Sequence, residues 1–334
     1  MPSPRVLIIS PSASAAANNG NWHTAWRWSQ MLHPAFDATI ARHWNGDPFD
    51  VMLALHARRS ADSIARWAQA NFHVTGAPYK APGLGVVLTG TDLYRDIETD
   101  TAAQASLRYA SQLVVLQECG AQALPVELRP KTRVIFQSTA AQAALPKPFD
   151  ALRVVMVGHL RDEKSPQTLM QAARLLKGHA DVLIEHIGGA LDPDLGAQAR
   201  ACMADCPQYR WLGGLAHLEA LQKIAQAHVL VHTSRMEGGA HVILEAVCSG
   251  TPVLASHIPG NVGMLGADYG GYFALGDAHG LADLLLRCRA ERGQTNGVYA
   301  QLSQQCALRA PLFSPATEQA AVRALVNDLL HANP

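Results

Sequence analysis

Short apolar runs alternate along the chain with longer segments whose apolar residues recur at helical spacing. Such alternation predicts βαβ units, which build parallel sheets covered by helices. The runs form two series. The first predicts strands at Arg5–Ser10, Asp50–Leu55, Gly85–Thr89, Gln112–Leu116 and Thr132–Ile135. The second predicts strands at Arg153–Val157, Asp181–Ile187, Tyr209–Leu212, Val229–Thr233 and Pro252–Ala255. Among the helices between them we expect Ser60–Ala70, Thr168–Leu175, Leu218–Ala227 and His241–Cys248. The chain should therefore contain two doubly wound α/β domains.

The two series meet in a stretch without a clear period, which contains Pro146 and Pro148. Closely spaced prolines of this kind are typical of a linker. We therefore expect a first domain over residues 1–140, a linker over 141–152 and a second domain over 153–313. The remaining residues, 314–334, contain a final helix that follows Pro315.

The composition excludes several classes of protein. Apolar residues make up 49% of the 334 residues and charged residues 16%, a balance that argues against disorder. Lys and Arg total 27, as do Asp and Glu, so the chain lacks the basic excess of a general nucleic-acid binder. Its apolar runs are shorter than the ~20 residues of a membrane helix, and its six cysteines form no CxxC pair. We expect a cytoplasmic protein with reduced thiols and small-molecule substrates, without nucleic acid and without membrane insertion.

Ligands of open α/β sheets bind beyond the carboxyl ends of the strands, so the loops there are the candidate sites. The loop Gly158–Ser165 follows a predicted strand and offers His159, Arg161 and Lys164. Cations beside a helix start suit a phosphate. The alternative is a solvated loop in which the acidic residues between these cations neutralise them.

A second loop holds Glu237, Gly238 and Gly239, and the helix after it holds Glu245. Free N–H groups at a helix start attract anions. Eight residues of helix rise ~12 Å, too far for two carboxylates to flank one bond but suitable for gripping both ends of a long ligand. The alternatives are a surface charge at Glu237 and an exposed helix residue at Glu245. A third loop, Ser256–Gly263, either meets the same ligand or merely turns the chain.

Polar residues also follow two strands of the first half. The loop Asn18–Asn21 contains three amides and a glycine, which suit an anion or a simple turn. Asp92 either orients a sugar hydroxyl or a cationic partner, or caps the following segment. Trp22, Trp26 and Leu32 recur at helical spacing, and we expect them in the core, with Trp28 off that stripe.

The segment EGGAHVILEAVCSGTPVLAS resembles the Glu-x7-Glu donor motif of the retaining GT-B glycosyltransferases of family 4, with Glu237 and Glu245 at the two Glu positions. VGHLRDEKSP is similar to that family's diphosphate loop, with Lys164 at the Lys position. The resemblance implies a GT-B fold, in which two Rossmann-like domains face a cleft and the final helix packs back on the first domain. It also implies a UDP-sugar donor, no cofactor and no essential metal.

The resemblance assigns roles residue by residue. It implies that Glu237 contacts the hexose, Glu245 the ribose hydroxyls, and Lys164 the diphosphate. The family usually has Arg directly after the loop glycine, where this chain has His159, and Arg161 is the candidate replacement. The implied catalytic residues are Glu237, Lys164 and Arg161. The implied donor-binding residues are Gly158, His159, Gly238, Gly239, Ala240, His241, Val242 and Glu245.

Three segments extend the resemblance to a particular subfamily. NNGNWHTAWRW, GTDLYRD and GHLRDEK are together similar to the selenosugar synthases of selenoneine biosynthesis. This implies transfer of a sugar, N-acetylglucosamine in the first instance, from a UDP-sugar to selenophosphate. The implied acceptor-binding residues are Asn18, Asn19, Gly20, Asn21, Thr91 and Asp92. The alternatives are a glycosyltransferase with a hydroxyl acceptor and a non-catalytic module that binds UDP-sugar.

Overall fold

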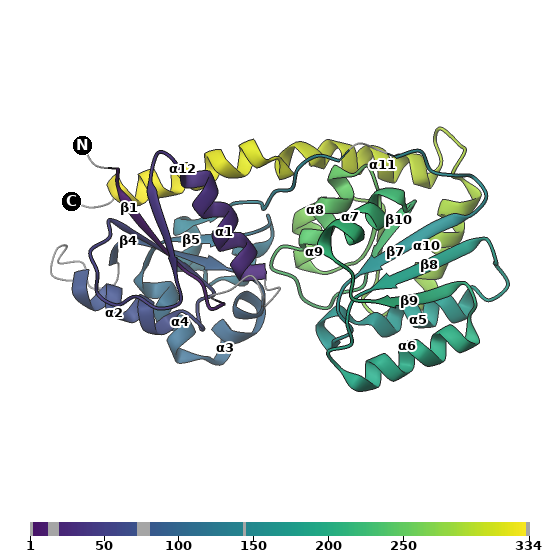
Figure 1. The fold of residues 1–334 in the computed structure, drawn as a ribbon, viewed down its shortest axis with the longest axis horizontal. Coiled ribbons are helices and arrows are strands. Elements are labelled where there is room, and N and C mark those ends of the chain that lie inside the picture. Colours follow the sequence, from purple (N-terminus) through teal and green to yellow (C-terminus); the bar gives the residue numbers. More distant parts are fainter. Residues whose placement is uncertain (1–2, 13–19, 72–80, 143–144, 332–334) are drawn as a thin grey trace. The chain divides into compact units, whose positions relative to one another are not determined.

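The computed structural model describes residues 3–12, 20–71, 81–142 and 145–331 (Figure 1). The chain divides into two compact units. Unit 1 consists of Met1–Gln137 together with Pro315–Pro334, and unit 2 of Ser138–Ser314. Within the described ranges, no helix combines the length and the apolar character that crossing a membrane requires.

Unit 1 contains one six-stranded parallel sheet in the order β2-β1-β3-β4-β5-β6. Its strands are β1 Arg5–Ile9, β2 Asp37–Ala41, β3 Val51–Leu55, β4 Ala81–Leu88, β5 Ala110–Val115 and β6 Thr132–Val134. The five strands predicted in this half are confirmed, with shifts of up to four residues at their ends. The sequence pattern missed β2, an edge strand in which every residue keeps some exposure and which therefore lacks a buried apolar run.

Helices cover both faces of this sheet. They are α1 Gly20–Leu32, α2 Ala61–Asn71, α3 Ile97–Thr99, α4 Thr101–Tyr109 and α12 Pro315–His331. Val6 and Ile8 of β1 belong to the core formed with α1 and α12, whereas Leu7 and Ile9 belong to the core formed with α2 and α4. Successive side chains of a strand point to opposite faces, so a continuous apolar run is buried on both sides.

The helix α12 is anchored to α1 by a buried carboxylate, Glu318. It accepts hydrogen bonds from Nε1 of Trp28 at 2.7 Å and from Arg27 at 2.8 and 3.0 Å. Figure 1 shows the two helices side by side. The expectation that Trp26 lies in the core and Trp28 off the stripe is wrong, because Trp28 is fully buried and Trp26 is 53% exposed. The apolar stripe instead runs through Ala25, Trp28 and Leu32, which recur every three or four residues.

Unit 2 contains a second six-stranded parallel sheet, in the order β12-β11-β10-β7-β8-β9. Its strands are β7 Leu152–Val157, β8 Val182–Ile187, β9 Tyr209–Gly213, β10 Val229–His232, β11 Val253–Ser256 and β12 Tyr272–Phe273. The five strands predicted in this half are confirmed. The sequence pattern missed only β12, a strand of two residues at the edge of the sheet.

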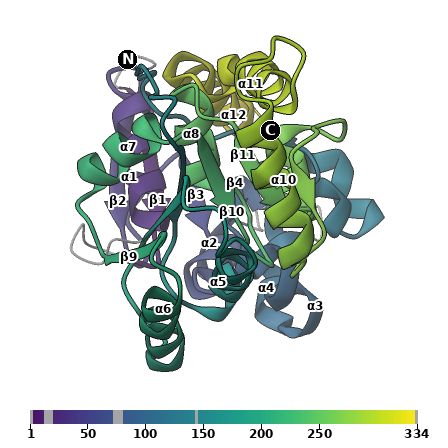
Figure 2. The same cartoon turned by 90° about the vertical axis from the view of Figure 1, so that its right-hand side faces the viewer.

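The helices of unit 2 are α5 Pro166–Leu175, α6 Pro193–Asp205, α7 His217–Gln226, α8 His241–Cys248, α9 Pro259–Leu265, α10 Ala278–Ala290 and α11 Val298–Arg309. The helix α5 packs between α6 and α10, and α8 packs between α7 and α11 (Figure 2). The predicted bounds of α8 are confirmed to the residue. All strands of the sheet are parallel, so the loops after β7, β10 and β11 lie at one edge, the carboxyl edge, where the candidate residues occur.

Candidate functional site

Lys164 and Glu237, from two different predicted loops, contact each other at the carboxyl edge of unit 2. Nζ of Lys164 lies 2.5 Å from Oε1 of Glu237, and their side chains are only 17% and 11% exposed. The two residues meet because their loops follow β7 and β10, which pair directly in the sheet. At this depth little water screens the charges, so the contact is strong. The alternative that Glu237 is a surface charge is therefore wrong.

A third side chain, His232, joins this contact. It is the last residue of β10, it is almost fully buried, and its Nε2 lies 3.1 Å from the same carboxylate oxygen. Burial lowers the pKa of His232 although Glu237 opposes the shift. Burial alone would raise the pKa of Glu237, but Lys164 and His232 outweigh it and hold that pKa far below its usual value. Glu237 is therefore ionised and His232 is neutral.

Hydrogen bonds to backbone carbonyls hold the two loops together. Oγ1 of Thr233 donates to the carbonyl of Lys164 at 2.7 Å, and the amide of Arg235 donates to the carbonyl of Glu163 at 2.9 Å. The third loop forms the start of α9 and packs against Glu237. A Cβ at Gly260 would lie 2.1 Å from the carbonyl oxygen of Glu237, so only glycine allows this approach. The third loop thus positions Glu237 rather than merely turning the chain.

Glu245 lies in α8 and is buried, so the alternative of an exposed helix residue is wrong. Its Oε1 lies 2.7 Å from Nε2 of His217 and 3.4 Å from Nε2 of His241. The hydrogen bond to Glu245 raises the pKa of His217. The helix begins only at His241, so the eight residues from Glu237 to Glu245 are not all helical and the distance expected from a continuous helix does not apply.

The helix start brings the remaining residues of the second loop together. Ala240 precedes the first turn of α8, and His241 and Val242 open it. Gly238 and Ala240 are buried, whereas Gly239, His241 and Val242 keep partial exposure. The first N–H groups of a helix have no partner within it, so this end is suited to a phosphate oxygen.

The first loop presents His159 and Arg161 differently. Nδ1 of His159 accepts the amide of Gly189 at 3.1 Å, which fixes the ring, and burial lowers its pKa with help from Arg161 and Lys164. Arg161 is 48% exposed and reaches Glu163 only at 3.9 Å. Gly158 precedes these residues and is closely approached by Gly188, where a Cβ would lie 2.0 Å from the Gly158 carbonyl oxygen. Arg161 is therefore the more available cation of the two.

The predicted acceptor residues lie in unit 1. Asn18 and Asn19 fall outside the described residues. Gly20 and Asn21 open α1, where Gly20 accepts the hydroxyl of Thr24 at 2.9 Å. Thr91 keeps partial exposure, and its Oγ1 lies 3.2 Å from Nε2 of His56.

Asp92 has a structural surrounding. It is fully buried, and its carboxylate accepts the amides of Thr89, Gly90 and Ala57 at 2.9, 2.9 and 3.0 Å. It therefore ties the end of β4 to the end of β3, and does not present its oxygens to solvent. Its side chain bonds backward along the chain, not to the segment that follows, so the capping alternative is also wrong.

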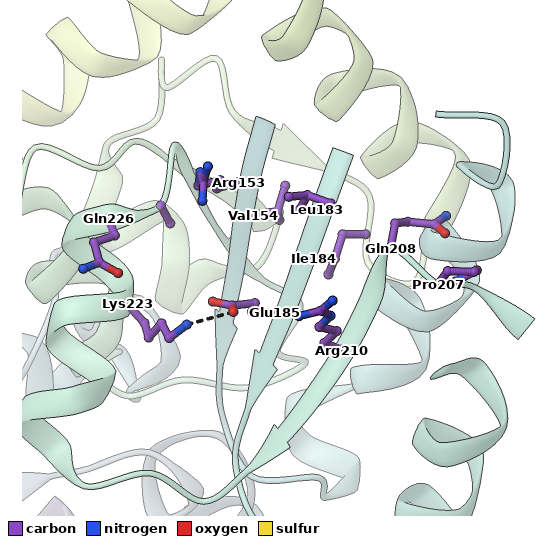
Figure 3. A pocket seen from close by; sticks show the side chains of 11 residues that line it. Arg153, Val154, Leu183, Ile184, Glu185, Pro207, Gln208, Arg210, Lys223 and Gln226 are labelled. Carbon is purple, nitrogen blue, oxygen red and sulfur yellow. Dashed lines mark hydrogen bonds and ion pairs between the residues drawn. The ribbon is translucent and has the colours of Figure 1, made fainter. Parts of the chain in front are cut away.

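A separate cavity of about 190 Å³ lies between α7 and the strands β7, β8 and β9. Figure 3 shows the ion pair of Lys223 with Glu185 across it, at 2.8 Å. Its lining includes Arg153 and Gln208, from the first halves of their strands or just before them. The cavity thus lies toward the amino ends of the strands, away from Lys164 and Glu237. In the part of the chain that the structure describes, no group of three or more His, Cys, Asp or Glu is placed to hold a metal ion.

Comparison with known proteins agrees with this arrangement. Residues 137–292 match the family model described as glycosyl transferases group 1. No curated protein sequence matches the chain. Similar solved structures include HepE of Anabaena in complex with UDP and glucose, which is 15% identical, with a TM-score of 0.72 over 97% of this chain and 100% of that one. Sucrose-phosphate synthase of Thermosynechococcus elongatus is also 15% identical, with a TM-score of 0.73 over 99% of this chain and 100% of that one.

A glycosyltransferase of Rickettsia africae is 12% identical, with a TM-score of 0.70 over 98% of this chain and 99% of that one. Identities this low establish the fold alone. The family model covers the segment that contains Lys164, Glu237 and Glu245. The chain thus has the GT-B fold, and its residues 137–292 match the family model of group 1 glycosyl transferases.

Proposed function

We propose that this chain is a glycosyltransferase that moves N-acetylglucosamine from a UDP-sugar to selenophosphate and releases a seleno-sugar and UDP. The contact of Lys164 with Glu237 is the main support for donor binding, because it joins the loop similar to a diphosphate loop and the Glu-x7-Glu motif in one site. HepE, which shares the fold, has been solved with UDP-glucose.

The charges of the site suit a sugar diphosphate. In the free protein the Lys164 ammonium and the Glu237 carboxylate neutralise each other. When the donor binds, its diphosphate attracts Lys164, and Glu237 is then released to accept hydroxyl hydrogens of the hexose. The start of α8 adds N–H groups toward the diphosphate, and Arg161 adds an exposed cation. Glu245 has one oxygen paired with histidines, which leaves its second oxygen to accept the ribose hydroxyls of the donor.

The reaction is a substitution at the anomeric carbon. The C1–Se bond forms as the C1–O bond to the diphosphate breaks, and the leaving oxygen of UDP takes the electron pair. Lys164, Arg161 and the helix N–H groups stabilise that developing charge, which is where preorganised cations accelerate a reaction most. Selenophosphate is already anionic, so it needs no strong general base. The selenium step is supported by the resemblance of the sequence segments around Asn18, Asp92 and His159.

The test replaces one lysine at a time. Lys164→Met should lower kcat about 10²–10³-fold, the usual effect of losing one group that stabilises transition-state charge. Lys223→Met is a matched control, because Lys223 also pairs with a glutamate but lies beside the separate cavity. UDP release is measured with UDP-N-acetylglucosamine and selenophosphate. Equal activities of the two variants would show that Lys164 does not serve the donor.

A further inference from the structure

His56 lies at the carboxyl edge of the unit 1 sheet in a strained and closely held conformation. It follows the last residue of β3, and its φ of 71° is rare for a residue that has a side chain. Its amide donates to the carbonyl of Val87 at 2.8 Å, and its carbonyl accepts the amide of Ser60 at 3.0 Å. The residue is only 3% exposed. Strain that the surrounding structure maintains is characteristic of functional sites.

The hydrogen bonds of the ring determine where its proton is. Nδ1 accepts the amide of Arg59 at 3.3 Å, so Nδ1 carries the lone pair. Burial lowers the pKa of His56, although Asp92 opposes the shift, and the ring is therefore neutral with its proton on Nε2. Nε2 then donates to Oγ1 of Thr91 at 3.2 Å. The hydroxyl hydrogen of Thr91 must point elsewhere, and it has no acceptor among the described residues.

Around this pair, one of three arginines has no ion pair among the described residues. Arg58 reaches Asp96 and Asp100 at 3.4 and 3.3 Å, and Arg95 reaches Asp96 at 3.4 Å. Asp92 is saturated by backbone amides. Arg59 is exposed, acts electrostatically on the His56 ring, and has no ion pair in the part of the chain that the structure describes. The ring thus orients a hydroxyl donor and accepts the backbone amide of a residue whose exposed guanidinium has no ion pair within the described ranges.

We propose that Thr91 and Arg59 form an oxyanion subsite in unit 1, held in place by His56, for the phosphate-like group of the acceptor. A guanidinium and a hydroxyl donor both bind oxygens of a tetrahedral anion. Thr91 and Arg59 contact the ligand, whereas His56 is a positioning residue that acts through both. The proposal rests on the proposed function only for the identity of the acceptor.

The first experiment measures binding of inorganic phosphate to the full chain by calorimetry. Wild type should bind it, and Thr91→Val and Arg59→Ala should each weaken the affinity at least tenfold. Thr91→Ser keeps the hydroxyl and should bind like wild type. Arg66→Ala is the control, because Arg66 lies in α2 and pairs on the surface with Asp62. Absence of phosphate binding, or unchanged binding by Thr91→Val and Arg59→Ala, would overturn the proposal.

The second experiment tests the positioning role of His56. Asn tolerates positive φ, so His56→Asn should keep the fold while it removes the ring N–H that orients Thr91. Its phosphate affinity should fall about as far as that of Thr91→Val, and the double variant should fall no further. The affinity for UDP should stay unchanged. Losses that multiply in the double variant would show that His56 and Thr91 act independently, and would refute this role. If His56→Asn does not fold, His56→Gly, which relieves the strained φ, replaces it in the same cycle.

These readouts separate this proposal from the proposed function. If the variants weaken phosphate binding as predicted but selenophosphate is not turned over, the subsite stands and belongs to another phosphorylated acceptor. Turnover of selenophosphate with phosphate binding unaffected by the variants would keep the reaction and reject the subsite.

Discussion

The ion pair of Lys164 with Glu237 makes a quantitative prediction about stability. Removing one partner of a buried pair leaves the other charge uncompensated and costs about 3–5 kcal/mol. The two side chains are 17% and 11% exposed, so we place each single variant, Lys164→Met and Glu237→Gln, at the lower end, about 3 kcal/mol. A loss of this size lowers the melting temperature of a unit of this length by about 6–12 °C.

The double variant isolates the free energy with which Lys164 and Glu237 stabilise each other from their interactions with other residues. Lys164→Met with Glu237→Gln leaves no unpaired charge, so it should lose less than either single variant, rather than the about 6 kcal/mol that independent effects would give. The coupling free energy should therefore exceed about 3 kcal/mol. The assay is calorimetric unfolding without nucleotide, with the transition of unit 2 analysed separately from that of unit 1.

The chain contains its own control. Lys223 and Glu185 lie 2.8 Å apart, but their side chains are 35% and 32% exposed. Exposed pairs of this kind couple by less than about 1 kcal/mol. The same four-variant cycle on that pair, with the same substitutions, should give the smaller value. Equal coupling in the two cycles would refute the argument that burial strengthens the Lys164 contact.

Three further predictions follow from the described contacts. The pKa of Glu237 is lowered on folding, so its stabilising effect is present above its unfolded pKa of about 4.3 and is lost progressively below it. The difference in unfolding free energy between wild type and Glu237→Gln should therefore shrink from pH 5 to pH 3, and a constant difference would contradict this. The pKa of His217 is raised, so protonated His217 should compete with UDP for Glu245 and weaken UDP binding as pH falls through that pKa. In calorimetric titrations, the UDP affinity of His217→Gln should no longer depend on pH in this way, and an unchanged pH profile would exclude the competition. Glu318→Ala leaves the Arg27 guanidinium and the Nε1 of buried Trp28 without their acceptor, and should cost about 3 kcal/mol. Amide exchange should rise in α12, and unchanged protection would show that the carboxylate does not anchor this helix.

The strands of both sheets were predictable because their residues are buried on both faces. Residues 51–55 and 229–231 are continuously apolar, so the sequence pattern indicates these strands without knowledge of the strands they pair with. The missed strand Asp37–Ala41 lies at an edge, where alternate exposure removes the apolar run. The stripe of α1 was misjudged because the burial of Trp28 depends on Glu318, which is 290 residues away in the chain.

The site was predictable as far as its loops, but not in its contacts. Parallel strands bring Lys164 and Glu237 to the same edge, which the strand pattern indicates. Their direct pairing depends on the order of the strands, and that order comes from the sheet rather than from the sequence spacing. His232 was missed, although a polar residue that ends a buried apolar strand is the signal that points to it. No sequence pattern indicates a role for His56, since its positive φ is a property of the folded backbone.

Mass spectrometry of the products formed by the purified protein decides whether it transfers a sugar to selenophosphate. It is incubated with UDP-N-acetylglucosamine, with and without selenophosphate, and Glu237→Gln is the paired control. We predict UDP and a selenium-containing sugar in equal amounts, only with both substrates and only with the wild type. UDP release without selenium incorporation would contradict transfer to selenophosphate, and a seleno-sugar formed equally by Glu237→Gln would contradict the role of Glu237.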